Sequence, residues 1–147
     1  MNTLTPTLSQ LLQKIEVDPT FLGRVQYRKG NLKGAEISFR RAIEIDPEHG
    51  AAHWFLGCLL EVKGVLDGAE MCFRRAIDID PEHGAAHWSL GCLLEAKGVL
   101  DGAEMCFLRA IEIDPEDGAA HWSLGCLLEA KGVLDAPDRV ELSDDGE

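Results

Sequence analysis

Histidines recur in this sequence at a spacing that could bind a metal ion. They form two pairs four residues apart, His49 with His53 and His83 with His87. Two imidazoles at positions i and i+4 of a helix can share one metal ion. The pairing ends in the next copy, where Asp117 replaces the first histidine. We therefore favour surface histidines over a metal site, and we expect neither a metal nor a cofactor.

The five cysteines offer nucleophilic or redox chemistry, but their spacing argues against both. They are separated alternately by 14 and 20 residues, with no C-x-x-C motif: Cys58, Cys72, Cys92, Cys106 and Cys126. An odd number at such spacing indicates free thiols instead of a disulfide framework. No serine lies in a G-x-S-x-G motif, and no glycine-rich segment matches a phosphate-binding loop. We therefore do not expect an enzyme.

Length and charge narrow the remaining classes. The chain has 147 residues, of which 46% are hydrophobic, so a packed core is expected. With 14 Lys and Arg against 26 Asp and Glu, the net charge of −12 disfavours nucleic acid and anionic membranes as partners. No apolar run reaches membrane-helix length, and the first residues lack the features of a signal peptide. We expect a cytoplasmic protein, with the nucleus as the alternative.

An internal repeat explains the recurring residue types. Residues 50–83 and 84–117 differ at only five of 34 positions, and residues 118–135 repeat residues 84–101 without a change. A fixed period of this length is typical of stacked structural units, each of which cannot bury its apolar face without a neighbour.

Each unit has the pattern of two helices, so the predicted fold class is all-α. Apolar residues recur at helical spacing before Gly64, which we expect to end the first helix with a positive φ. Asp67 is predicted to N-cap the second helix, with Glu70 completing a capping box. Asp80 and Pro81 should end it, because proline cannot continue a helix.

Gly57 lies inside the first predicted helix, where glycine costs about 1 kcal/mol relative to alanine. It recurs as Gly91 and Gly125, with Gly23 in register. This recurrence predicts a close approach of the two helices, with the small side chain of Ala69 against Gly57.

The pattern resembles the tetratricopeptide repeat (TPR) family. Six residues of one unit stand at the spacing of the family's 34-residue motif: Leu56, Gly57, Ala69, Phe73, Ala76 and Pro81. Two positions depart from it. Trp54 lies one residue later than the family's tryptophan, where His53 stands, and Leu60 occupies the family's tyrosine position.

The resemblance implies a short α-solenoid, a right-handed superhelix of antiparallel helix pairs whose first helices line a concave groove. It also implies a non-catalytic scaffold or adaptor that binds a peptide or helix of another protein. Three rows of residues would face that groove: Trp54, Cys58 and Glu61; Trp88, Cys92 and Glu95; Trp122, Cys126 and Glu129.

Tryptophans are frequent binding anchors, and the glutamates would favour basic residues on a partner. The alternative is that each tryptophan packs on the neighbouring repeat and that each glutamate is simply solvated. Family members that bind the acidic tails of chaperones use a clamp of Lys, Asn and Arg. The positions concerned carry Trp54, Cys58 and Val62 here, so this activity is disfavoured.

The ends of the array depart from the repeat. We predict a capping helix in residues 1–19, a degenerate first repeat in 20–49 with a shortened first helix near residues 20–29, full repeats in 50–83 and 84–117, a half repeat in 118–135 and an acidic tail in 136–147. Pro137 stands where a second helix should continue.

The half repeat has one helix and no predicted partner helix after it. Its leucines would then be partly uncovered: Leu124, Leu127 and Leu128. This predicts a surface that is covered by self-association in a homo-oligomer or by a partner. The alternatives are that Val140 and Leu142 fold back over it, or that the chain is a fragment of a longer array. The alternative function is accordingly a structural unit that assembles through this helix.

Overall fold

The computed structural model describes residues 5, 7 and 17–133, and these form seven helices without a strand. The helices are α2 (Pro19–Arg28), α3 (Leu32–Ile45), α4 (Gly50–Val62), α5 (Leu66–Ile79), α6 (Gly84–Ala96), α7 (Leu100–Ile113) and α8 (Gly118–Ala130). The all-α prediction is confirmed, and the short first helix begins and ends within one residue of its expected bounds. Most of the predicted capping helix and the whole acidic tail lie outside the described residues.

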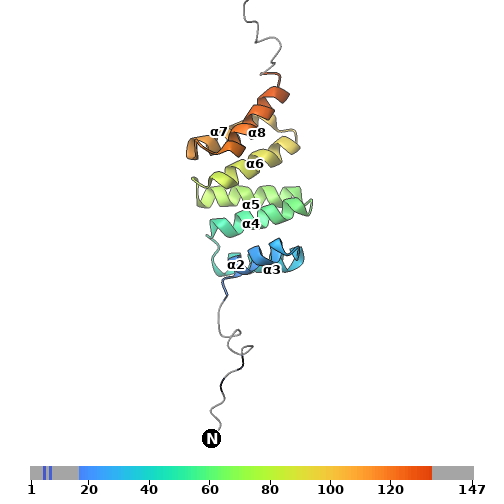
Figure 1. Cartoon of the computed structure of the whole chain (residues 1–147), viewed down its shortest axis with the longest axis vertical. Helices are drawn as coiled ribbons and strands as arrows, with labels where there is room; N and C mark the ends of the chain where they lie inside the picture. The colour runs from blue at the N-terminus through green and yellow to red at the C-terminus, as the bar shows by residue number, and fades with distance from the viewer. Residues whose placement is uncertain (1–4, 6, 8–16, 134–147) are drawn as a thin grey trace, which may run out of the picture.

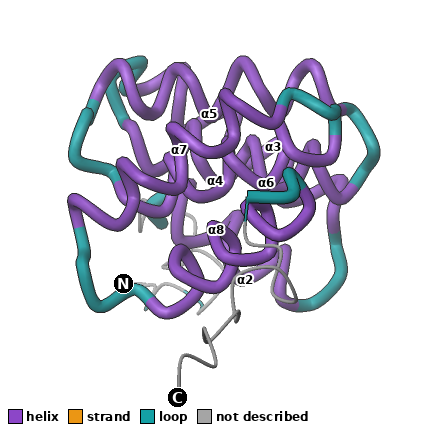
Figure 2. Tube along the Cα trace, turned by 90° about the horizontal axis from the view of Figure 1, so that it is seen from above, coloured by secondary structure: helices purple, strands orange, loops and turns teal. Residues whose placement is uncertain are grey.

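The helices stack in chain order as pairs along the long axis of the molecule (Figure 1). Each pair packs most extensively within itself, and each first helix then packs on the second helix of the preceding pair. The second helices α3, α5 and α7 form one layer, and the first helices α2, α4, α6 and α8 form the other (Figure 2). Within the described part of the chain, no helix combines the length and the hydrophobicity needed to span a membrane.

The turn inside each pair depends on a glycine. Gly30, Gly64, Gly98 and Gly132 have φ between 74° and 80°, a region that side chains disfavour. In the second pair, the Gly64 amide donates to the Glu61 carbonyl and the Val65 amide to the Leu60 carbonyl at 2.8 Å. These bonds satisfy carbonyls that the end of α4 would otherwise leave unpaired. The predicted stop at Gly64 is confirmed.

The predicted N-cap at Asp67 is wrong. α5 begins at Leu66, directly after the turn, so its N-cap is Val65, which has no capping side chain. Asp67 lies in the first turn of the helix, where its negative charge complements the helix dipole. Glu70 pairs with Lys97 at 2.6 Å instead of completing a capping box. Only Gly64 and Val65 lie between Lys63, the C-cap of α4, and Leu66, the first residue of α5. Because the turn is this short, Val65 and not Asp67 occupies the N-cap position.

Histidines are the N-caps of two of the first helices, α4 and α6. The Nδ1 atoms of His49 and His83 accept from the amides of Ala52 and Ala86, at 3.4 and 3.2 Å. In the next unit Asp117 occupies the same N-cap position. The first histidine of each pair is therefore a half-buried cap and not a surface residue.

A histidine near the start of each of α4, α6 and α8 bonds to the preceding Asp-Pro turn. The Nε2 atoms of His53, His87 and His121 lie 2.8–2.9 Å from the carbonyl oxygens of Pro47, Pro81 and Pro115. A neutral imidazole that is protonated at Nε2 donates to such a carbonyl. The family's tryptophan position thus carries a histidine that links the first helix to the preceding turn.

The core is centred on three phenylalanines, each of which packs against a glycine of the first helix. Phe39, Phe73 and Phe107 are at most 1% exposed. A Cβ atom built on Gly57 would lie 2.6 Å from the Phe73 ring, and one on Gly91 equally close to Phe107. The predicted close approach is real, but the residue that requires it is the phenylalanine and not Ala69. The ring needs the volume that a side chain at Gly57 would occupy.

The glycine contact generates a matched pair of substitutions. Gly91→Ala should lower the free energy of unfolding by about 1–3 kcal/mol, because the buried Phe107 ring must move to admit the methyl group. Gly125→Ala, at the same position of an identical helix, meets nothing within 4 Å and should stabilise α8 by up to about 1 kcal/mol. Urea denaturation followed by circular dichroism measures both. Equal shifts in the two variants would contradict the packing argument.

The histidine caps predict a loss of stability in mild acid. Burial lowers the pKa of His83, with a smaller effect of the neighbouring His87 in the same direction and an opposing effect of Asp80. Because the folded-state pKa lies below that of the unfolded chain, about 6.5, this stabilisation is complete above pH 6.5 and is lost as the pH falls through the folded value. The variant His83→Asp reproduces the Asp117 cap. Its urea midpoint should fall less between pH 7.5 and pH 5.5 than that of the wild type, and parallel profiles would refute the assignment.

Candidate functional site

Two of the three tryptophans that we expected in the groove make hydrogen bonds between consecutive first helices. Trp54 and Trp88 are half-buried and pack against the core. The Nε1 atom of Trp54 donates to Ser89 Oγ at 3.0 Å, and Trp88 repeats this bond to Ser123 at the same distance. Of the two alternatives for these residues, the structure therefore has each tryptophan packed on the neighbouring unit, with its N–H group already occupied.

Trp122 has a different environment although its helix has the same sequence. α6 and α8 are identical over 13 residues, yet Trp122 is 75% exposed. In the two preceding units the indole is covered by the next first helix. The difference therefore comes from the neighbours of the helix and not from its own sequence.

Cys58 and Cys92, in the rows of Trp54 and Trp88, are neutral thiols. Burial and the charge of Glu61 raise the pKa of Cys58 to about 12, although a hydrogen bond with Ser89 opposes them. Burial and the charges of Glu61 and Glu95 raise the pKa of Cys92 to about 11. All five cysteines are free, as predicted. Thiols that hold their protons at neutral pH are poor nucleophiles.

The glutamates of the rows lie beside the cysteines without a cationic partner. Glu61 is half-buried, and this burial raises its pKa. Glu95 is also half-buried, whereas Glu129 is exposed. No ion pair forms at these three carboxylates within the described residues. Glu61 and Glu95 both raise the pKa of Cys92, so carboxylates of two adjacent units act on one thiol.

Other glutamates of the repeat are paired, which sets the row glutamates apart. The C-cap lysines of α4, α6 and α8 bond a glutamate of the preceding second helix at 2.6 Å: Lys63 with Glu36, Lys97 with Glu70 and Lys131 with Glu104. Hydrogen bonds from these lysines lower the pKa of Glu36 and Glu70. These pairs hold adjacent units together, so their carboxylates are not available to a ligand.

Two residues of α2, Arg24 and Tyr27, continue the rows, and Arg28 follows Tyr27; all three were missed in the sequence. Arg24, Tyr27 and Arg28 stand 34 residues before Cys58, Glu61 and Val62. Together with Trp54, Phe55 and Cys58 they line a cavity of about 270 Å³ between α2 and α4. Subtraction of one period from the predicted rows would have found Arg24 and Tyr27, and the same step from Val62 would have found Arg28. We call the side of α2, α4, α6 and α8 that carries these positions the first-helix face.

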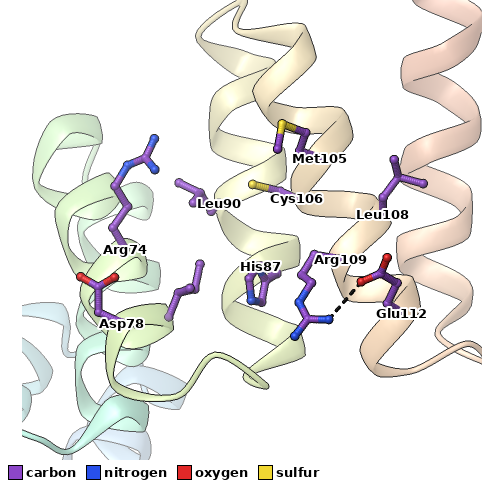
Figure 3. Close-up of a pocket in the computed structure, with 10 residues that line it drawn as sticks. Arg74, Asp78, His87, Leu90, Met105, Cys106, Leu108, Arg109 and Glu112 are labelled. Atoms are coloured by element: carbon purple, nitrogen blue, oxygen red, sulfur yellow. Dashed lines mark hydrogen bonds and ion pairs between the residues drawn. The ribbon is translucent and has the colours of Figure 1, made fainter.

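A second type of depression lies between successive second helices. One of these has a volume of about 630 Å³. Arg74, His87, Cys106 and Arg109 are among the residues that line it (Figure 3). The same depression recurs one unit earlier. His87 is bonded to Pro81, and burial raises the pKa of Cys106, so these two groups offer no catalytic pair. Within the described residues, no three His, Cys, Asp or Glu side chains gather as metal ligands do.

The predicted self-association surface is only partly exposed. Leu124 and Leu128 are half-buried, whereas their equivalents Leu90 and Leu94 are 3% and 5% exposed. Leu127 is fully buried, so its inclusion in that surface is wrong. Its side chain points into the core cluster that α7 shares with α8. Trp122, which the prediction assigned to the groove, is the larger exposed apolar residue of this helix.

Comparison with known proteins identifies the repeat. The family model described as "Tetratricopeptide repeat" matches residues 21–83 and 56–118, which together make up about two thirds of the chain. No curated protein sequence matches the chain.

Solved structures show the same fold. The first TPR of Spaghetti (RPAP3), bound to the HSP90 peptide SRMEEVD, has a TM-score of 0.75 at 17% identity over 78% of this chain and 90% of that one. MamA has a TM-score of 0.76 at 23% identity, over 86% and 76% of the two chains. A mutant O-GlcNAc transferase of Thermobaculum terrenum has a TM-score of 0.71 at 26% identity, over 84% of this chain but 23% of that enzyme.

Because Trp88 and Trp122 have different environments, their substitution by alanine should lower the free energy of unfolding by different amounts. Trp88→Ala should lower the free energy of unfolding by roughly 2–4 kcal/mol, since it removes a packed indole and its bond to Ser123. Trp122→Ala should change it by about 0.5 kcal/mol or less, because that ring is largely exposed. Urea denaturation of both variants gives the comparison. A large cost at Trp122 would mean that another part of the chain covers it.

Proposed function

Since the chain belongs to the tetratricopeptide repeat family, whose domains are protein-interaction modules, we propose that it is a non-catalytic adaptor that binds a segment of a partner protein on its first-helix face. We further propose that basic residues of this segment lie over Glu61 and Glu95. The groove of the family would then be formed by α2, α4, α6 and α8.

The observation that carries this proposal is the pair of half-buried carboxylates without a cation. A partly desolvated carboxylate is stabilised when a Lys or Arg of a ligand approaches it. Glu61 has the raised pKa of such a group, and Glu95 repeats its position one unit later. The C-cap lysines Lys63, Lys97 and Lys131 do not compensate them, because these lysines are bonded to glutamates of the second helices.

The remaining groups of the rows suit an apolar floor. The rings of Trp54 and Trp88 are partly exposed, but their N–H groups are occupied by serines, so they offer ring surface and not a hydrogen bond. The neutral thiols of Cys58 and Cys92 add small apolar contacts. A ligand would therefore be fixed by ring contacts along the floor and by charge at its edge.

The charge of this face points to a different ligand from that of one structural relative. The RPAP3 domain is bound to the peptide SRMEEVD, whose EEVD end is acidic. Unpaired glutamates in the central units of this chain would repel such an end. We therefore propose a partner segment with basic residues in that part of the face.

A second candidate function is assembly through α8. The exposure of Trp122 favours it, together with the partial exposure of Leu124 and Leu128. These residues stand where the two preceding units receive the next first helix. A second copy of the chain that covered them would bury an apolar surface, as a solenoid does at each internal junction.

Removal of the two carboxylates tests the first proposal. The chain is used to select binders from a random dodecapeptide phage library, and the selected peptides are measured by fluorescence anisotropy. The selected peptides should be rich in Lys and Arg. The variant Glu61→Gln/Glu95→Gln should bind them roughly tenfold more weakly, since each lost charge contact contributes up to about 1 kcal/mol or slightly more.

The control removes two charges from the other layer. Glu44 and Asp78 are exposed, stand one period apart and form no ion pair within the described residues. Glu44→Gln/Asp78→Asn should therefore leave binding unchanged apart from a small long-range effect. Sedimentation should give the same mass for both double variants, because α8 is unaltered. Equal losses of binding in the two would refute a site on the first-helix face.

A further inference from the structure

The first-helix face changes the sign of its charge along the array. We infer that the cavity between α2 and α4 is a subsite for an acidic side chain of the bound segment. The segment would then lie with an acidic residue at α2 and basic residues toward α6. This inference rests on the proposed function and adds the chemistry and the direction of the ligand.

Two arginines without carboxylate partners define this end of the face. Arg24 and Arg28 are four residues apart, on one side of α2, and both line the cavity. Neither forms an ion pair within the described residues, whereas Arg40, Arg74, Arg75 and Arg109 all do. Lys29, Lys33 and Arg41 also form no ion pair within the described residues, but of these cations without partners only Arg24 and Arg28 line the cavity.

The cavity has the size and the walls for one side chain. Its volume of about 270 Å³ lies below the usual range for sites of drug-sized ligands, roughly 300–1,000 Å³. Phe39, Trp54 and Phe55 supply apolar walls for the methylene groups of a Glu or Asp. The guanidinium group of Arg24 lies 5.3 Å from the centre of the Phe55 ring, which orients it by a cation–π contact.

The donors of the cavity suit a carboxylate. A guanidinium group stacked on a ring retains N–H donors around its edge, and two of them can bind both oxygens of one carboxylate. Arg28 adds a second positive charge, and the hydroxyl group of Tyr27 can donate to the same acceptor. A carboxylate here would therefore be held by charge and by directed hydrogen bonds.

The repeat period places the cavity in line with the glutamates. Arg24 occupies in the first unit the position of Cys58 and Cys92, and Tyr27 occupies that of Glu61 and Glu95. A segment that follows the first helices meets the arginines in one unit and the glutamates in the next two. Charge complementarity then selects one direction for a segment that carries both signs.

Synthetic peptides test the subsite. Three amidated dodecapeptides are compared by fluorescence anisotropy: one with a block of three Lys residues among alanines, one with that block and a block of three Glu residues at the other end, and one of alanines with a single Lys. The mixed peptide should bind the wild type about five- to tenfold more tightly than the Lys peptide. Arg24→Gln/Arg28→Gln should abolish this gain and leave the binding of the Lys peptide within about twofold.

Two further variants separate charge from folding. Arg28→Gln alone keeps the contact of Arg24 with Phe55 and should lose at least half of the gain, measured as free energy. Lys33→Gln/Arg41→Gln removes the same charge from exposed residues of α3 and should keep all of it. A free C-terminal carboxylate on the Lys peptide tests the other source of this chemistry. If that peptide gains as much as the mixed one, the subsite takes a chain terminus and the side-chain assignment is overturned.

Photo-cross-linking measures the direction. A benzophenone placed beside the Glu block should label α2 or the start of α4, and one beside the Lys block should label α6 or α8. Labelling in the reverse order, or no gain from the Glu block while the Lys peptide binds, overturns this inference but not the proposed function. If the Lys peptide binds no better than the peptide with a single Lys, the proposed function fails first.

Discussion

The contact between a glycine of the first helix and a phenylalanine of the second helix, made in the pairs α2–α3, α4–α5 and α6–α7, determines the geometry on which the rest of the array depends. Phe73 is fully buried, and its ring occupies the volume that a side chain on Gly57 would need. The same contact recurs at Gly91 and Phe107. Because close packing transmits even small shifts, a fixed distance within every pair also fixes how the next pair is seated. The alignment of the rows on the first-helix face therefore depends on this distance between the helices of a pair.

The junctions between pairs use polar contacts that differ from this apolar core. A lysine–glutamate pair lies at all three junctions, and the last two junctions also carry a hydrogen bond from a tryptophan to a serine. The exposed pairs contribute little stability individually, since surface ion pairs are screened by water. These ion pairs do determine which carboxylates are neutralised by cations of the array itself. Glu61 and Glu95 form none of these ion pairs, so their negative charge on the first-helix face is not compensated.

Much of the fold followed from the sequence, because the period and the glycine and proline positions act locally. Gly64 and Pro81 end their helices for reasons contained in a few residues. The errors arose where the outcome depends on residues far apart in the chain. Asp67 is not the N-cap of α5, because the turn before the helix places Val65 at that position. Leu127 is buried against α7. The partner of Trp54 is a serine 35 residues away, which no helical pattern reveals. Arg24 was missed because the degenerate first unit keeps the register of the repeat but not its residue types.

The different environments of two identical helices bear on how such a chain grows. The helix α8 has the same 13 residues as α6, so it presents the tryptophan that an additional unit would receive through its serine. A duplicated 34-residue segment would therefore arrive with both halves of its junction already compatible. Lengthening of the gene by unequal recombination requires no new interface under these conditions. The near-identity of residues 50–83 and 84–117 is the record that such copying would leave, before selection had differentiated the copies.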